Sequence, residues 1–127
     1  MNDNPLKVLV VEPMKRPYVQ EIDGSLASMQ KLVGGTIQAV YPFEDPVALV
    51  CNDEGKLLTL PYNRFLYDEN RNPYDVVCGT FFVVGVGEEN FKSLTDRQIR
   101  KYHDMYSQEF ILPVQGKERK EPNDKER

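Results

Sequence analysis

Residues 36–60, TIQAVYPFEDPVALVCNDEGKLLTL, form the stretch that decides the predicted fold, because no other segment concentrates so many apolar, β-prone residues. In residues 36–43 the apolar side chains of Ile37, Ala39, Tyr41 and Phe43 alternate with Thr36, Gln38 and Val40, and Pro42 places this strand's end, or a sheet edge, there. Residues 47–51 are apolar throughout, which is typical of an interior strand. The motif NDEG at 52–55 predicts a tight turn, with Gly55 in a left-handed bulge position and a return strand over 56–60.

The segment before this stretch predicts a hairpin and a helix. The nearly continuous apolar run at 7–12 favours a strand buried on both faces, and the alternation at 18–23 favours its hairpin partner. Apolar residues at helical spacing over 25–33 predict a short helix. Ser25 is the expected N-cap and Gly34 the expected left-handed C-terminal residue.

The segment after this stretch predicts further strands and a second helix. We expect a single helical turn at 61–67 and a polar loop at 68–73. An apolar run at 74–84, broken by Gly79, includes a strand at 80–84. Thr95 and Gln98 form a predicted capping box at the start of a helix over 95–107.

These elements indicate an α+β fold, with a mainly antiparallel sheet of five to six strands and two short helices packed on it. We assign residues 1–116 to one domain, consistent with the length of 127 residues. Residues 117–127, KERKEPNDKER, contain no apolar side chain and are expected to form a disordered, charged tail.

Composition restricts the classes of partner. The net charge of −4 disfavours nucleic-acid binding, which requires a basic surface. No apolar run reaches the roughly 20 residues of a membrane span, and no export signal precedes the first strand. We therefore expect a cytoplasmic protein without membrane contact. Cys51 and Cys78 lie in apolar runs and are predicted to be reduced core thiols.

No set of catalytic residues stands out in the sequence. His103 is the only histidine, and no Cys, Asp or Glu cluster accompanies it at metal-ligand spacing, so we predict no metal and no cofactor. No serine lies on a strand-to-helix elbow of the kind that exposes a nucleophile. The sequence thus favours a non-catalytic protein, with a small enzyme using Asp or Glu chemistry as an alternative.

Five polar residues are the predicted ligand-binding set: Lys15, Arg16, Tyr18, Asn63 and Arg64. Two adjacent cations in a proline-bracketed loop, and an Asn–Arg pair beside aromatic residues, could hold a phosphate and stack on a base. Binding of one ligand by all five residues requires that residues 15–18 and residues 63–64 lie close together in space. A structural alternative pairs Arg64 with Asp45 or Asp68.

The residues also resemble a known family. The runs KVLVVEPMKRPYVQEIDGSLASMQKLVGGTIQAVYPFEDPVALVCNDEGKLLTLPYNR, GTFFVVG and ENFKSLTDRQIRKY are similar to the domain-of-unknown-function 3846 family, most specifically in YPF-x-DPVALVCNDEGK. The resemblance implies an accessory protein of a phage, plasmid or conjugative element. It supplies no catalytic or ligand-binding residue.

The resulting prediction is an accessory protein that binds a small, nucleotide-like and phosphate-bearing ligand, or a host protein, in counter-defence. An alternative is a protein–protein interaction module that forms homo-oligomers. Its contact would use sheet edges or an aromatic helix face of Tyr102, Tyr106 and Phe110.

Overall fold

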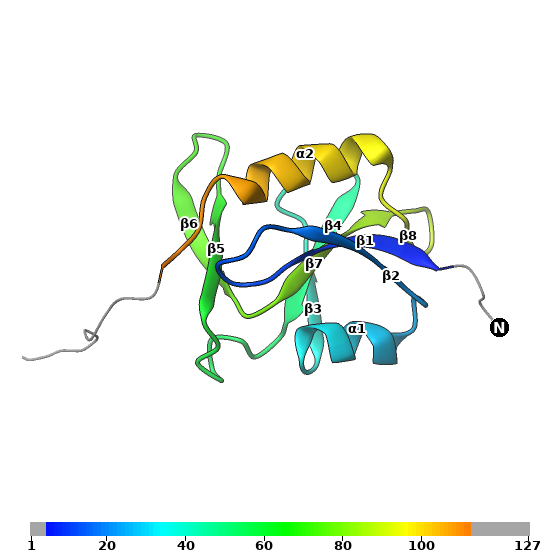
Figure 1. Cartoon of the computed structure of the whole chain (residues 1–127), viewed down its shortest axis with the longest axis horizontal. Helices are drawn as coiled ribbons and strands as arrows, with labels where there is room; N and C mark the ends of the chain where they lie inside the picture. Colours follow the sequence, from blue (N-terminus) through cyan, green and yellow to red (C-terminus); the bar gives the residue numbers. More distant parts are fainter. Residues whose placement is uncertain (1–4, 113–127) are drawn as a thin grey trace, which may run out of the picture.

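The computed structural model describes residues 5–112, which form two helices and eight strands. The main sheet lies between α2 on one face and α1 on the other, and a separate hairpin of β5 and β6 closes one end (Figure 1). The elements are β1 (Leu6–Val11), β2 (Tyr18–Ile22), α1 (Leu26–Val33), β3 (Ile37–Val40), β4 (Val47–Asn52), β5 (Tyr62–Tyr67), β6 (Pro73–Cys78), β7 (Phe81–Val86), β8 (Phe91–Lys92) and α2 (Asp96–Ser107).

The strand order of the main sheet is β2-β1-β7-β4-β3, with β8 paired to β7. Every strand pair among the described residues is antiparallel. The predicted α+β fold, with its antiparallel sheet and two helices, is therefore confirmed. The end of the domain at 116 and the tail at 117–127 lie outside the described residues.

The core divides into two halves because the central strands alternate strictly. In β1, β4 and β7 the odd-numbered core residues face α2 and the even-numbered ones face α1. Phe81 and Phe82 show this most clearly, since each is fully buried but in a different half. The strands at 7–12 and 47–51 were predicted to be covered on both faces, and residues 8–11 and 47–51 are buried on both.

Both helices begin as their sequences predict. The Ser25 hydroxyl accepts a hydrogen bond from the Ser28 amide at 3.0 Å, and Gly34 ends α1 with φ 81°. At α2 the Thr95 hydroxyl accepts from the Gln98 amide at 3.1 Å, while the Gln98 side chain accepts from the Thr95 amide at 3.0 Å. This reciprocal pair is the predicted capping box.

Three local predictions are wrong. Residues 56–60 do not form a return strand, because residues 53–59 coil into successive turns, with a bond from the Leu58 amide to the Glu54 carbonyl at 2.8 Å. Residues 61–67 are not a helical turn, since residues 62–67 form β5 and pair with β6. The left-handed residue among the turns is Thr59, with φ 54°, and not Gly55.

Gly55 is required for a different reason, which is lack of space. A Cβ atom at this position would lie 2.7 Å from the Cys78 carbonyl oxygen, a backbone atom that cannot move aside easily. At Gly34, by contrast, φ is 81° and a Cβ atom would meet no other atom within 4 Å. Steric crowding thus selects glycine at 55, and backbone conformation selects it at 34.

Substitutions at these two glycines should separate the two causes. We expect Gly55→Ala to destabilise the protein by about 1–3 kcal/mol, and Gly55→Asn to be at least as harmful, because a larger side chain collides further. At Gly34 the order should reverse, since asparagine tolerates the left-handed region better than alanine. Urea denaturation of the four variants measures this, and a Gly55→Asn variant more stable than Gly55→Ala would refute the steric explanation.

The loop between β3 and β4 is tied to α2 through Asp45. Its Oδ2 atom accepts a hydrogen bond from the Tyr102 hydroxyl at 2.7 Å and lies 2.8 Å from Lys101 Nζ. These contacts, Lys101 first, lower the pKa of the Asp45 carboxyl. Asp45 therefore does not pair with Arg64, which was one of the two alternatives considered from the sequence.

This contact predicts an acid-sensitive contribution to stability. The folded-state pKa of Asp45 is below its unfolded value, so the contribution is present above about pH 4 and is lost as the pH falls. We expect Asp45→Asn to be less stable than the wild type at pH 7 by roughly 1 kcal/mol, with the difference shrinking toward pH 3. Chemical denaturation across this range measures it. The neighbour Glu44 supplies the control Glu44→Gln, and a pH-independent difference for Asp45→Asn would exclude the ion pair as its cause.

Candidate functional site

Arg64 of β5 is the most unusual residue among those predicted to bind a ligand. Its side chain is only 2% exposed, although it carries a charge. Nε and Nη2 donate to the Tyr106 carbonyl at 3.3 and 2.8 Å, and Nη2 also donates to the Lys15 carbonyl at 2.8 Å. Nη1 donates to the backbone and side-chain oxygens of Asn63 at 3.1 and 2.7 Å. These five bonds match the five N–H donors of a guanidinium group.

The positive charge of Arg64 is stabilised without a carboxylate partner. Among the described residues it forms no ion pair, so the pairing with Asp68, the other alternative from the sequence, is also absent. Its acceptor Tyr106 lies in the last turn of α2, where the helix dipole favours a cation. The ring of Phe110 stacks 4.6 Å from the guanidinium carbon. Burial lowers the pKa of this guanidinium, yet an arginine remains protonated at neutral pH.

Asn63 extends the same network to the main sheet. Its side chain is fully buried, and Nδ2 donates to the carbonyls of Val11 and Gly79, each at 2.9 Å. Asn63 and Arg64 therefore join β5 to the end of β1, the β6–β7 connection, the β1–β2 loop and the end of α2. We call this network the arginine clasp.

The other three predicted residues lie at the surface around the β1–β2 loop. The Tyr18 hydroxyl donates to Glu12 at 2.6 Å, a bond that raises the pKa of Tyr18 to about 12 and lowers that of Glu12. Lys15 Nζ lies 3.3 Å from the other Glu12 oxygen. Arg16 is exposed and forms no ion pair within residues 5–112.

The two predicted segments thus meet in space, through the bond between Arg64 and the Lys15 carbonyl. They meet at the backbone, however, and the donors of Asn63 and Arg64 already serve protein oxygens. A phosphate could reach the cations of Lys15 and Arg16 without disturbing the fold. Ligand binding by these five residues remains a prediction, and the geometry favours the loop residues over the buried pair.

An apolar groove of about 550 Å³ opens beside this loop. We call it the loop groove, and residues of the β1–β2 loop, the turns before β5, the β5–β6 hairpin and the segment after α2 line it. They are Pro13, Met14, Lys56, Thr59, Leu60, Pro61, Tyr62, Val76, Cys78, Ile111 and Leu112. Its volume lies within the range of small-molecule sites. The sequence gives no signal of this groove, since its walls come from four separate segments.

Two residues of this groove have an unusual backbone conformation. Met14 has φ 62° and Thr59 has φ 54°. Only three non-glycine residues of the described chain have a positive φ, and two of them therefore line this groove. The left-handed region is particularly unfavourable for the β-branched Thr59. Such conformations are held in place by the surrounding structure and concentrate at functional sites.

Groups capable of catalysis are sparse among the described residues. No three His, Cys, Asp or Glu side chains there are placed to hold a metal ion. Cys51 and Cys78 are free and buried, as predicted, and burial raises the pKa of both thiols. The His103 imidazole is partly exposed, 3.4 Å from the Ser107 hydroxyl.

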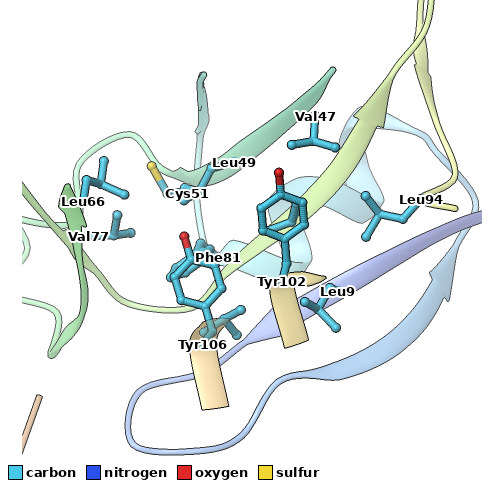
Figure 2. Close-up of a cluster of buried hydrophobic side chains, with 12 residues drawn as sticks. Leu9, Val47, Leu49, Cys51, Leu66, Val77, Phe81, Leu94, Tyr102 and Tyr106 are labelled. Atoms are coloured by element: carbon cyan, nitrogen blue, oxygen red, sulfur yellow. The ribbon is translucent and has the colours of Figure 1, made fainter. Parts of the chain in front are cut away.

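The aromatic helix face predicted for self-association is largely unavailable. Tyr102 and Tyr106 are 0% and 5% exposed, and both point from α2 into the core (Figure 2). The Tyr106 ring meets Phe81 edge-on, with centroids 5.4 Å apart. Neither helix among the described residues is long and apolar enough to cross a lipid bilayer.

Comparison with protein-family models places most of the chain in one family. Residues 6–107 match the family described as "Domain of unknown function (DUF3846)". The chain belongs to the DUF3846 family. No curated protein and no solved structure matches this DUF3846 chain. The matched range includes the Asn63 and Arg64 side chains and most of the loop groove, and it ends at the last residue of α2.

The clasp predicts that lysine cannot replace Arg64. We expect Arg64→Lys to lower the free energy of unfolding by at least about 2 kcal/mol, since the three donors of an ammonium lie on one nitrogen and cannot replace the five bonds that Arg64 makes to Lys15, Asn63 and Tyr106. Arg100→Lys, at an exposed position of α2, is the matched control and should change stability by less than about 0.5 kcal/mol. Equal effects of the two substitutions in urea denaturation would show that the clasp does not stabilise the fold.

Proposed function

We propose that this DUF3846 chain is a non-catalytic binding protein whose loop groove takes a small, nucleotide-like ligand bearing a phosphate. The observation that carries the proposal is that Met14 and Thr59, which are 45 positions apart, both adopt strained conformations at the wall of one apolar groove. The fold maintains this strain, which is on the order of 1–3 kcal/mol per residue. A shaped binding surface is a reason for it to do so.

The apolar wall suits a planar ring. Tyr62 and Met14 both line the groove and are 60% and 49% exposed, so an incoming ring would bury apolar surface that now faces solvent. A tyrosine ring can stack on any nucleobase, and each such stack contributes roughly 1–3 kcal/mol to the binding free energy. Methionine adapts its shape to an irregular ligand.

Cations at the rim suit a phosphate. Lys56 lines the groove, and Lys15 and Arg16 follow Met14 directly in the β1–β2 loop. Glu12 pairs with Lys15 and Asp75 pairs with Lys56, whereas Arg16 forms no ion pair with a described carboxylate. An arginine can bind a phosphate through two parallel hydrogen bonds.

The groups inside the groove favour binding over catalysis. Cys78 is its one thiol, and burial raises its pKa, so the reactive thiolate is disfavoured. Lys56 donates to Asp75, which raises the pKa of its ammonium and keeps it charged. Every described carboxyl with a perturbed pKa has it lowered, namely Glu12, Asp23, Asp45 and Asp75. A general acid near neutral pH would need the opposite shift.

Binding of this kind would let an accessory protein of a phage or mobile element act in counter-defence. By holding a nucleotide of the host in the loop groove, the protein would withdraw it from host enzymes. Such sequestration requires affinity but no chemical step.

Thermal denaturation with a ligand panel tests the proposal. AMP, ATP, GMP and cyclic AMP at millimolar concentration are compared with adenosine and guanosine. A ligand at one hundred times its Kd adds about 2.7 kcal/mol, which should raise Tm by several degrees. Titration calorimetry then gives Kd for any ligand that stabilises the protein.

Three variants make the test specific to the loop groove. Tyr62→Ala should weaken every ligand at least tenfold, and Arg16→Ala should weaken nucleotides but not nucleosides. Tyr41→Ala is the matched control, because Tyr41 is 62% exposed but does not line the groove. Absence of a Tm shift with every nucleotide, or equal loss in the Tyr62 and Tyr41 variants, would refute the proposal.

A further inference from the structure

A second groove, of about 760 Å³, is lined in part by Arg64 and lies between the β5–β6 hairpin and the C-terminal half of α2. We call it the helix groove. Its apolar surface includes Phe43 of the β3–β4 loop, Phe65 of β5 and Met105 of α2. Phe65 and Met105 are 37% and 43% exposed, so this surface remains open to solvent.

Carboxylates surround this apolar surface. Asp68 and Glu69 line the groove from the β5–β6 loop, and Glu109 lines it from the segment after α2. None of the three forms an ion pair with a described cation. Asp68 accepts hydrogen bonds from two backbone amides of its loop, and Glu109 accepts one from the Tyr67 hydroxyl at 2.6 Å.

Two arginines also line the helix groove and offset part of its negative charge. The donors of Arg64 are all used within the clasp. Arg71 adopts φ 67° in the β5–β6 loop and forms no ion pair with Asp68, Glu69 or Glu109. The groove therefore combines open aromatic and methionine surface with three carboxylates and two guanidinium groups, so the carboxylates are in excess by one charge.

We propose that the helix groove binds a peptide segment of a partner protein that carries Lys or Arg beside apolar side chains. Charge complementarity selects this occupant, because carboxylates around the site attract a basic segment and fix its register. The exposed rings of Phe65 and Tyr67 can receive a cation on their faces, and Met105 adapts to different apolar anchors. The same carboxylates repel nucleic-acid phosphates and anionic lipid headgroups.

Fluorescence anisotropy with designed peptides tests this inference on the full chain. The probe is the fluorescein-labelled peptide KLKKFLKKLK, compared with KGKKGGKKGK, of equal charge, and ELEEFLEELE, of opposite charge. We expect saturable binding of the first peptide and at least tenfold weaker binding of the other two. Equal affinity for the two basic peptides would show that the apolar surface takes no part, and would overturn the proposal.

Two double variants distinguish binding at the helix groove from attraction to the overall negative charge of the protein. Glu69→Gln with Glu109→Gln removes two charges from the groove, and should weaken the first peptide at least tenfold. Glu88→Gln with Glu89→Gln removes two charges from the β7–β8 loop, and should change affinity less than twofold. Equal losses would refute the site. Light scattering completes the test, because dimerisation abolished by the groove variant would identify a second copy as the occupant and overturn the assignment to a foreign peptide.

Discussion

The buried guanidinium of Arg64 is the interaction on which the arrangement of this fold depends. The β5–β6 hairpin forms no hydrogen-bonded ladder with the main sheet in the described part of the chain, so other contacts must attach it. Leu66 and Val77 contribute apolar packing, which is not directional. Arg64 and Asn63 add bonds of defined geometry to four separate segments. The hairpin is thereby oriented as well as attached.

A buried cation is stable here because every donor has an acceptor. Desolvation of a charge is costly unless hydrogen bonds and dipoles replace water. The last turn of α2 provides such a dipole, and Arg64 in turn satisfies one of the carbonyls that a helix end leaves free. The helix end thus supplies acceptors for the guanidinium, and the guanidinium supplies donors for the helix end. An apolar residue at position 64 would leave those carbonyls without partners.

Much of the main sheet could be predicted from sequence, since its signals are local. Residues 8–11 and 47–51 have no polar side chain facing either layer, and this pattern is typical of strands with both faces covered. Ser25, Gly34 and Thr95 mark helix ends through their own side chains or backbone freedom. These residues specify structure within a few positions of themselves, so no knowledge of distant partners is needed.

The hairpin and the candidate sites could not be predicted, because their determinants are distant. Residues 56–60 are apolar enough for a strand, but Gly55 packs against the Cys78 carbonyl and the chain coils instead. Asn63 and Arg64 resemble exposed polar residues in sequence, and only their distant acceptors reveal them as buried. The loop position of Lys15 and Arg16 follows from the two prolines that flank them, whereas the apolar groove beside them depends on chain segments up to Leu112.

The contacts of the clasp with residues at both grooves have a thermodynamic consequence. Its acceptor Lys15 adjoins Met14 in the wall of one groove, and its acceptor Tyr106 forms part of the wall of the other. Moving either wall away from Arg64 breaks bonds to the same guanidinium. A ligand that moved Arg64 together with one wall would therefore change the free energy needed to displace the other. By the reciprocity of linked equilibria, that influence acts with equal strength in both directions.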